Sequence, residues 1–281
     1  MNDLNHLPDG MNNFSVLIAV YQKDKSEYLD LSLSSIINQS IPPTEIILVK
    51  DGPIPTDLDR IIEQWRSRFN GEFKIISLDT NRGLGEALGI GLNACTNEIV
   101  ARMDADDICE LNRFEIQMDY LRKNSEIDVL SSCVAEFDFD HTKIGRYRKV
   151  PLSPGKIKVM AKFRNPINHM SVIFKKSSVI SAGNYHHCLW FEDYYLWARM
   201  MIKGYRFANL SEPLVRVRAN SEMFRRRGGI KYFQQEIRVQ REFLKMGFIS
   251  WPIYLFNCIF RGIVRLIPNN IRSLAYRALL R

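Results

Sequence analysis

Three aspartates, Asp104, Asp106 and Asp107, stand at the end of the apolar run EIVARM (98–103). Carboxylates this close together repel one another, and they add nothing to a hydrophobic core. A D-x-D pair on a short turn brings oxygens toward one point, and Mg²⁺ or Mn²⁺ takes oxygen ligands that it shares with substrate phosphates. The other interpretation is an acidic turn that caps a helix beginning near Glu110. The pattern alone leaves both interpretations open.

The elements that position these aspartates alternate between strand and helix. Short β-rich apolar runs predict strands at 14–20, 45–49, 73–78 and 98–103, and apolar residues at helical spacing predict helices between them. This alternation indicates an α/β fold with a doubly wound, mostly parallel sheet. Ligands bind at the carboxyl ends of the strands in such sheets, so we expect one site at that edge. The polar residues there are Tyr21, Asp51, Asn81, Arg82, Gly83, Asp104 and Asp106.

Two of these signals have turn chemistry as an alternative. Asp51 either accepts hydrogen bonds from a nucleotide base or ribose, or is a turn residue before Gly52-Pro53. The Asn81-Arg82-Gly83 stretch either brings backbone and guanidinium groups near phosphates or only reverses the chain. GLGEALGIG (83–91) superficially resembles a dinucleotide-binding glycine pattern. Counted from Gly83, however, Leu88 stands in place of the third glycine, and counted from Gly89 the stretch lies inside a predicted helix. The sequence therefore excludes that kind of site.

The second half of the chain has a less regular pattern. It predicts a helix at 110–123, strands at 129–137 and 168–176, and an aromatic helix that begins with Glu192-Asp193. Acidic residues are favoured at a helix start by capping and by the helix dipole. An acid beside apolar rings also suits a base that deprotonates a sugar hydroxyl. His169 is interpreted as a core histidine, a phosphate contact or a metal ligand.

Composition sets outer limits on the protein class. The 281 residues are 46% hydrophobic and 25% charged, as in an ordinary globular protein. Five scattered cysteines without C-x-x-C spacing indicate reduced thiols in a cytoplasmic setting, and argue against a disulfide framework or a zinc site. The polar start MNDLNHLPDG lacks the apolar segment of a signal peptide, so we expect a flexible leader at 1–12.

Positive charge is concentrated in the last part of the chain. From residue 216 onwards there are 14 Lys and Arg against 3 Asp and Glu. The apolar stretch at 248–268 is interrupted by Pro252, Arg261 and Arg265, so it is not predicted to span a bilayer. Residues 248–281 suit a helix lying on an anionic membrane surface. This interpretation rests on Trp251, Tyr254, Phe256 and the arginines at 261, 265, 272, 277 and 281. The competing interpretation is a helix packed on the domain or on a dimer partner.

Five stretches, taken together, resemble family 2 glycosyltransferases with a GT-A fold. They occur in the order of that family and cover roughly residues 14–210: SVLIAVYQKDKSEYLDLSLSSIINQS, EIILVKDGP, NRGLGEALGIGL, ARMDADD and FEDYYLWARM. The resemblance implies a catalytic domain at 13–215, with a nucleotide-binding half (13–107) and an acceptor half (108–215), and a basic helical region at 216–281. It also implies a nucleotide-diphosphate sugar donor, Mn²⁺ or Mg²⁺, and inversion at the anomeric carbon.

The resemblance implies roles for individual residues on the nucleotide side. Ala19, Val20 and Tyr21 would line the base pocket with Asp51. Lys50 stands where the family usually has the first of two aspartates, which leaves base recognition to Asp51. Arg82 and the Asn81–Gly83 turn would lie along the nucleotide.

The resemblance also implies roles for the acidic residues and for a basic loop. Asp104 would touch ribose or metal, and Asp106 would be the principal metal ligand. Asp193, beside Glu192, would be the catalytic base that activates the acceptor hydroxyl. The stretch Arg225-Arg226-Arg227-Gly228-Gly229 would close over the donor pyrophosphate or contact a phosphorylated acceptor, unless it is a solvated loop.

The expected function is inverting, metal-dependent transfer of a sugar from a UDP-sugar to a lipid-linked glycan, with dTDP or GDP as alternative carriers. The expected context is synthesis of cell-surface polysaccharide (O-antigen, capsule or exopolysaccharide) on the inner face of the cytoplasmic membrane. A sugar nucleotidyltransferase is the alternative, but it would need a glycine- and lysine-rich signature that Tyr21-Gln22-Lys23 does not supply. A nucleic-acid-binding protein is disfavoured by the acidic sheet edge.

Overall fold

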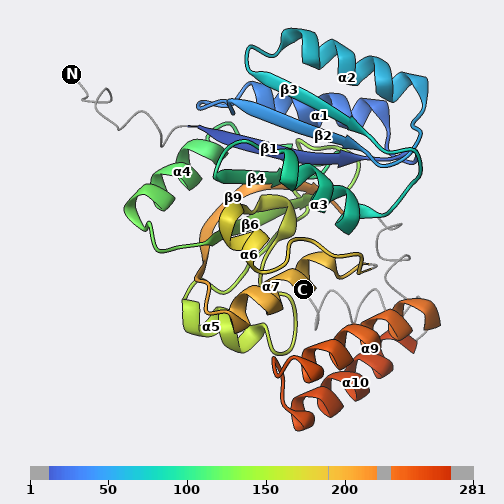
Figure 1. Ribbon diagram of the computed structural model, residues 1–281, viewed down its shortest axis with the longest axis vertical. Helices are drawn as coiled ribbons and strands as arrows, with labels where there is room; N and C mark the ends of the chain where they lie inside the picture. The colour runs from blue at the N-terminus through green and yellow to red at the C-terminus, as the bar shows by residue number, and fades with distance from the viewer. Residues whose placement is uncertain (1–12, 189, 220–228, 267–281) are drawn as a thin grey trace.

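The computed structural model describes residues 13–188, 190–219 and 229–266, which form one sheet of nine strands with helices around it (Figure 1). The strand order is β3-β2-β1-β4-β8-β6-β9-β5, and β7 pairs with β6. The strands are β1 (Phe14–Val20), β2 (Glu45–Lys50), β3 (Glu72–Ser77), β4 (Ile99–Met103), β5 (Ile108–Cys109), β6 (Val129–Phe137), β7 (Arg146–Arg148), β8 (Ile173–Lys175) and β9 (Phe207–Arg218).

The first four strands are parallel, as the alternating pattern predicts. β1 pairs with β2 and β4, and β2 pairs with β3. β1 is buried on both faces, which explains its run FSVLIAV, apolar except for Ser15. β3 lies at the edge of the sheet and alternates buried Phe73 with exposed Glu72 and Lys74, because at its start only the face of Phe73 packs on the core.

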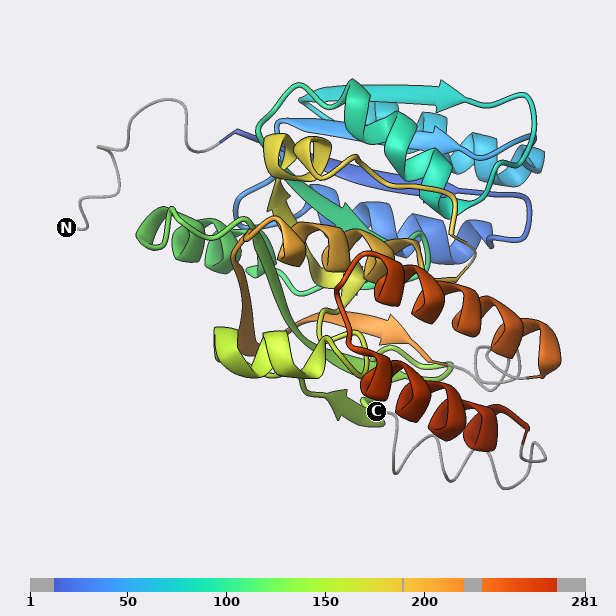
Figure 2. The same ribbon diagram turned by 60° about the horizontal axis from the view of Figure 1, so that its bottom comes forward.

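Helices cover both faces of this parallel region (Figure 2). One apolar core lies between the sheet and α1, α2 and α4, and a second lies between the sheet and α3, α6 and α7. The doubly wound arrangement is therefore confirmed for the first half. The helices are α1 (Ser26–Ile37), α2 (Thr56–Arg68), α3 (Leu84–Ala94), α4 (Arg113–Lys123), α5 (Pro154–Met160), α6 (Lys176–Ser181), α7 (Glu192–Ile202), α9 (Ile230–Lys245) and α10 (Trp251–Leu266), with one 3₁₀ turn, η1 (His169–Ser171).

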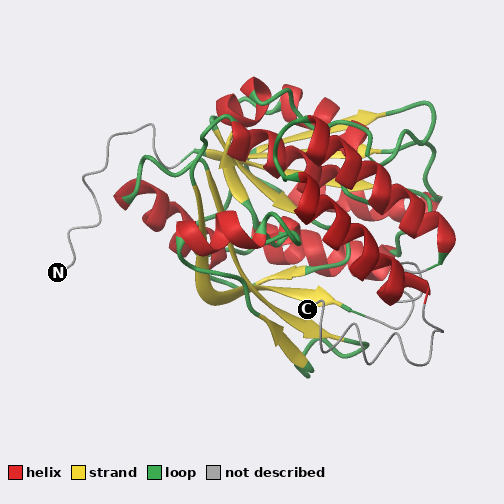
Figure 3. Cartoon of the chain, turned by 90° about the horizontal axis from the view of Figure 1, so that it is seen from below, coloured by secondary structure: helices red, strands yellow, loops and turns green. Residues whose placement is uncertain are grey.

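The second half of the sheet is mixed. β8 runs antiparallel to both β4 and β6, and β6 runs parallel to β9 with register shifts around Cys133. β9 reaches Arg218 and also holds the short antiparallel strand β5. Seen from below, the strands curve away from the parallel region while helices lie in front of them (Figure 3). The α/β class is confirmed, and this half is less regular than a doubly wound sheet.

Two predicted elements have different limits in the structure. The helix predicted from residue 110 begins at Arg113, because Glu110 continues the strand pairing by donating its N–H to the Leu214 carbonyl at 3.0 Å. The strand predicted at 168–176 is divided into η1, β8 and the start of α6. Its first residues cannot join the ladder, since the Asn168 side chain donates to the Ser132 carbonyl at 2.8 Å and Ser171 Oγ accepts the Ser132 N–H at 3.0 Å.

The last described segment is a helical hairpin, α9 and α10, which lie side by side at the bottom of Figure 1. Phe243 of this segment packs against Tyr194 of α7, and Tyr232 packs against Phe191, which directly precedes α7. Phe248 packs on Phe243. Within the described ranges, no helix is long and apolar enough to cross a membrane.

The expectation that Arg261 and Arg265 face a lipid surface is wrong. Both guanidinium groups are buried and pair with the buried carboxylate of Glu236 on α9. Burying either arginine without a counter-charge would be costly, so the pairing explains how two cations fit inside a hairpin. The competing interpretation, a helix packed on the domain, holds for this face of α10. Arg272, Arg277 and Arg281 lie outside the described residues.

Candidate active site

The acidic turn between β4 and β5 holds its carboxylates at an electrostatic cost. Burial, followed by the charge of Asp104, raises the pKa of Asp106 to about 6. Burial and the charges of Asp106 and Asp104 raise the pKa of Asp107 well above its usual range. Asp107 also accepts the backbone N–H of Arg218 at 2.9 Å, which ties the acidic turn to the end of β9. Carboxyl groups perturbed in this way are typical of functional sites.

Arg102 is the counter-charge that the sequence analysis missed. Its side chain is 2% exposed, and its Nη2 atom lies 2.5 Å from Asp104 Oδ1. Although burial alone lowers the pKa of Arg102, Asp104 raises it above its ordinary value. Its Nε and Nη1 atoms have no hydrogen-bond partner in the described part of the chain. The only signal in the sequence is an arginine within the apolar run EIVARM, a position where burial requires a partner.

Asp51 joins the ends of β2 and β3. Its two carboxylate oxygens accept the backbone N–H groups of Arg82 at 2.7 Å and Gly83 at 3.0 Å. The Asn81 side chain returns a hydrogen bond to the Asp51 carbonyl at 3.1 Å. Gly52 has φ of +87°, and a Cβ there would lie 2.6 Å from the Asn81 backbone nitrogen. Asp51 therefore fixes the turn at 81–83, and its carboxylate oxygens keep further acceptor capacity for a ligand.

The predicted base-pocket residues at the end of β1 lie in different environments. The Ala19 side chain packs on the core beneath α3, whereas Val20 is buried in the opposite core, as strand alternation requires. The Val20 carbonyl accepts the N–H of Asp51 at 2.8 Å. Tyr21 is half-buried, and its N–H donates to Asp24 at 2.9 Å. Arg82 extends toward solvent and pairs with Glu86 at 3.2 Å, with both side chains nearly half exposed.

The start of α7 brings the second acidic pair to the same edge of the sheet. Burial, followed by the charge of Asp193, raises the pKa of Glu192 to about 7, and the charges of Arg102 and Asp104 also act on this carboxyl group. Asp193 Oδ2 accepts a hydrogen bond from Asn165 Nδ2 at 2.7 Å. The structure therefore brings Glu192 and the acidic turn together, although many residues separate them in the sequence.

A glycine on α3 allows this close approach. A Cβ on Gly85 would lie 2.4 Å from the His186 carbonyl oxygen and 3.0 Å from the Glu192 Cβ. Any side chain at this position would push the segment before α7 away from α3. The glycine-rich stretch at 83–91 thus serves helix packing, which agrees with its rejection as a dinucleotide site.

His169 is a core histidine, which was one of the three interpretations of the sequence. Its Nε2 atom lies 2.9 Å from the Tyr185 hydroxyl, and its ring packs edge-on against Trp197. Burial, and to a lesser degree the charge of Arg102, lowers the pKa of His169 well below its ordinary value. A neutral ring in an aromatic core supports the fold behind the acidic turn.

Arg218 is a second basic group that the sequence analysis did not select. Its guanidinium carbon lies 3.6 Å from the centre of the Tyr28 ring and 4.6 Å from that of Phe137. Its charge lowers the pKa of Asp106, opposing burial. The predicted basic loop follows it, but Arg225 to Gly228 lie outside the described residues.

The donor set at the acidic turn fits a cation that is shared with a substrate. Among the described residues, no group of three or more His, Cys, Asp or Glu side chains is arranged to hold a metal ion. Mg²⁺ commonly needs only one or two carboxylates when phosphate oxygens supply further ligands. Asp106 offers such a carboxylate, and the mutual repulsion of Asp104, Asp106 and Asp107 is the cost that a bound cation would offset.

Comparison with a solved structure shows the same fold. The structure described as S. aureus TarS 1-349 in complex with UDP-GlcNAc superposes with a TM-score of 0.63 at 18% sequence identity, covering 83% of this chain and 66% of that chain. The mixed sheet and its flanking helices are consistent with the GT-A fold.

Comparison with known sequences gives much closer relatives. A protein of Escherichia coli named UDP-Gal:alpha-D-GlcNAc-diphosphoundecaprenol beta-1,3-galactosyltransferase is 38% identical over 275 residues, 98% of this chain and 99% of its own. An amylovoran biosynthesis glycosyltransferase of Erwinia amylovora is 41% identical over 266 residues, 94% of this chain and 97% of its own.

The sequence pattern of one enzyme family covers Asp51 and the acidic turn, and ends before α7. It matches residues 15–180, from β1 through the acidic turn to α6. Together with the two full-length relatives, this match favours glycosyl transfer over the nucleotidyltransferase alternative. The chain belongs to glycosyl transferase family 2 and is a glycosyltransferase.

Proposed function

We propose that this glycosyltransferase transfers a sugar from a UDP-sugar, with inversion, to a lipid-linked glycan. The observation that carries the proposal is the meeting of two acidic groups at one sheet edge. The acidic turn of Asp104 and Asp106 lies at the end of β4, and the Glu192-Asp193 pair at the start of α7 lies close enough for Asp104 to raise the pKa of Glu192. One group suits a cation with a diphosphate, and the other suits an acceptor hydroxyl.

The nucleotide side of the site is assigned to the ends of β1, β2 and β3. Asp51 and the 81–83 turn that it fixes would bind base and ribose, together with the backbone at Ala19, Val20 and Tyr21. Asp104 forms an ion pair with Arg102. Its carboxylate would accept a hydrogen bond from a ribose hydroxyl or share the cation. Asp106 would be the principal ligand of Mn²⁺ or Mg²⁺. When bound, such a cation supplies positive charge that stabilises the leaving diphosphate.

The acceptor side is assigned to Asp193. In the proposed step, its carboxylate takes the proton of the acceptor hydroxyl while the acceptor oxygen forms a bond to the anomeric carbon. The bond from that carbon to the diphosphate oxygen breaks on the opposite face, and UDP leaves with the bonding electrons. Attack and departure on opposite faces produce inversion. Glu192 lies beside Asp193, and burial keeps part of its population protonated near neutral pH.

The acceptor class is proposed from the relatives. One is named for transfer to a diphosphoundecaprenol-linked sugar, and another for amylovoran biosynthesis. We infer the same broad context for this chain, which is the assembly of O-antigen, capsule or exopolysaccharide on a lipid carrier. The sugar, the linkage and the choice of UDP over dTDP or GDP depend on the pocket that the substrates occupy.

The outer face of α10 suits contact with the membrane that would contain such a carrier. Trp251, Leu255, Ile259 and Ile263 recur every four residues and are exposed, so they form one apolar stripe along the helix. Phe256 extends this stripe to the exposed Phe163, with ring centres 6.0 Å apart. No acidic residue follows Glu242 in the sequence, which favours an anionic lipid surface. We propose peripheral attachment to the inner face of the cytoplasmic membrane through this stripe.

Calorimetry with a UDP-sugar tests the nucleotide and cation assignments. We expect binding that requires Mn²⁺ in the wild type and is lost in Asp106→Ala. Asp119→Ala is the matched control, because Asp119 is an exposed aspartate on α4 that pairs with Lys123. Equal binding without cation, or equal cation dependence in Asp106→Ala, would contradict the assignment.

A further inference from the structure

Residues 161–165, which we call the support segment, follow α5 and contact the first turn of α7. The Tyr194 hydroxyl donates to the Ala161 carbonyl at 2.7 Å, so α7 holds the first residue of the segment. At its other end, Asn165 Nδ2 donates to Asp193 Oδ2 at 2.7 Å. The segment therefore contacts α7 at two consecutive residues, Asp193 and Tyr194.

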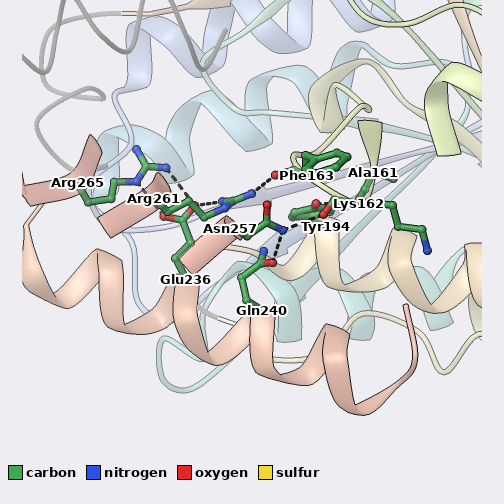
Figure 4. A network of polar contacts seen from close by, with 9 residues as sticks. All are labelled: Ala161, Lys162, Phe163, Tyr194, Glu236, Gln240, Asn257, Arg261 and Arg265. Atoms are coloured by element: carbon green, nitrogen blue, oxygen red, sulfur yellow. Dashed lines mark hydrogen bonds and ion pairs between the residues drawn. The ribbon is translucent and has the colours of Figure 1, made fainter. Parts of the chain in front are cut away.

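Side chains of the α9–α10 hairpin bind the backbone carbonyls in the middle of the support segment (Figure 4). Asn257 Nδ2 donates to the Lys162 carbonyl at 2.9 Å, and Arg261 Nη2 donates to the Phe163 carbonyl. The Lys162 ammonium group donates in return to the Phe248 carbonyl. Hydrogen bonds to consecutive carbonyls fix the path of the backbone rather than one side chain. The position of Asn165 thus depends on a hairpin that is distant in sequence.

The donors on the hairpin are themselves fixed. Asn257 Nδ2 also donates to Gln240 Oε1 at 2.8 Å. Arg261 pairs with Glu236, which also pairs with Arg265 at 2.9 Å. All five side chains are buried, so each polar group depends on these partners for its hydrogen bonds. The hairpin therefore presents its two donors to the support segment in one arrangement.

The orientation of the Asn165 amide follows from its two partners. Asn165 Oδ1 accepts the backbone N–H of Ile167 at 3.1 Å, which leaves Nδ2 to face Asp193. An amide donor stabilises a carboxylate and restricts its rotation. The opposite oxygen, Asp193 Oδ1, accepts the N–H of Tyr194 at 2.7 Å. Asp193 is thus oriented from two directions, one of which is the support segment.

We infer that Asn165 is a positioning residue for Asp193 and that the hairpin sets its position through the carbonyls of Lys162 and Phe163. The inference rests on the proposed role of Asp193 as the base. A base displaced by about 1 Å from the acceptor hydroxyl loses rate by as much as about 100-fold, whereas binding of the donor is unaffected. The C-terminal hairpin accordingly supports the reaction itself, in addition to any contact with a membrane.

Steady-state kinetics of Asn165→Ala and Asn257→Leu test this inference. We expect both variants to lower kcat about 10- to 100-fold while the KM for the UDP-sugar and the calorimetric stoichiometry of UDP binding stay within about twofold. Lys245→Ala is the matched control on the same hairpin, because its ion pair with Glu242 is exposed. A purely structural role would instead lower the stoichiometry, since misfolded molecules bind no UDP.

Asp193→Asn separates the inference from the proposed function. If Asp193→Asn transfers sugar at the wild-type rate, the base assignment is wrong. If Asp193→Asn is inactive but Asn165→Ala and Asn257→Leu keep wild-type kcat, the base assignment stands and the positioning role is refuted. Loss of kcat in Asn165→Ala alone would limit the inference to Asn165 and overturn the role of the hairpin.

Discussion

The buried guanidinium of Arg102 pairs with the carboxylate of Asp104 at 2.5 Å, so an arginine inside a strand balances the acidic turn that ends it. This pair decides how much negative charge the turn presents to a ligand. Asp104 enters the site with an ion-pair partner, whereas burial opposes the ionisation of Asp106 and Asp107, and Arg218 and Arg102 favour it.

Replacing Arg102 by Gln is expected to destabilise the protein. The change leaves Asp104 and its acidic neighbours without their buried counter-charge, and breaking such a pair costs about 3 kcal/mol. Urea unfolding measures the loss. Lys123→Gln is the control, because it removes an exposed ion pair with Asp119 and should cost less than about 1 kcal/mol. Equal effects of the two variants would show that the Arg102 pair is no stronger than a surface pair.

Cation-dependent donor binding is expected to weaken in acid. The pKa of Asp106 is raised to about 6, and a carboxylate must lose its proton to bind a metal. Affinity for Mn²⁺ with a UDP-sugar should therefore fall by up to about tenfold per pH unit below 6. A UDP-sugar is the right probe because its diphosphate is esterified at both ends, whereas the terminal phosphate of UDP titrates near the same pH. Constant affinity from pH 5 to 7.5 would argue against Asp106 as the ligand.

Glu192 is expected to reduce stability as the pH rises. Its pKa is raised to about 7 in the folded protein, so between about pH 4.5 and 7 the folded state holds a proton that the unfolded state has released. The stabilising contribution is complete below about pH 4.5 and is lost as pH rises through about 7. Glu192→Gln should remove this slope and gain on the order of 1–3 kcal/mol relative to the wild type between pH 5 and 8. Urea unfolding of the wild type and of Glu192→Gln at about pH 5 and about pH 8 measures their free energies of unfolding. A constant difference between them would contradict the raised pKa.

The Glu236 carboxylate is expected to hold the hairpin together. Burial alone would raise the pKa of Glu236, but Arg261 and Arg265 keep this pKa below its ordinary value. Its contribution is therefore present above about pH 4.5 and is lost as pH falls through the folded-state pKa. Glu236→Gln leaves two buried arginines short of a counter-charge, which costs about 3–5 kcal/mol. Hydrogen exchange should show faster opening of α9 and α10 in Glu236→Gln. Glu242→Gln is the control, because it removes only an exposed ion pair with Lys245, and it should leave the exchange rates unchanged.

The apolar stripe on α10 is expected to bind anionic vesicles. Combined Trp251→Ser, Leu255→Ser and Ile259→Ser should weaken co-sedimentation at least tenfold, which corresponds to about 1.4 kcal/mol. Leu111→Ser with Ile202→Ser is the control, because these exposed apolar residues lie in the turn before α4 and at the end of α7. Point variants are preferable to deleting α10, since deletion would leave Glu236 without its buried partners. Unchanged binding of the triple variant would remove the stripe from the membrane proposal.

The sequence by itself determined the alternation of strands and helices, the strand at 129–137, the acidic turn after β4 and the family. These features follow from local periodicity and from the order of short motifs, which a linear chain displays directly. The start of α7 at Glu192 was also predicted correctly, because its acidic and aromatic residues are contiguous.

Only the tertiary structure decided which charges are buried and what they meet. Arg261 and Arg265 have the sequence context of a membrane-facing helix. In the structure, both are buried and form ion pairs with Glu236 on the neighbouring helix. The contact between Asn165 and Asp193 likewise joins residues from different elements. Such pairings depend on how packed elements exclude water around a charge, and the periodicity of one segment contains no information about the segment that will cover it.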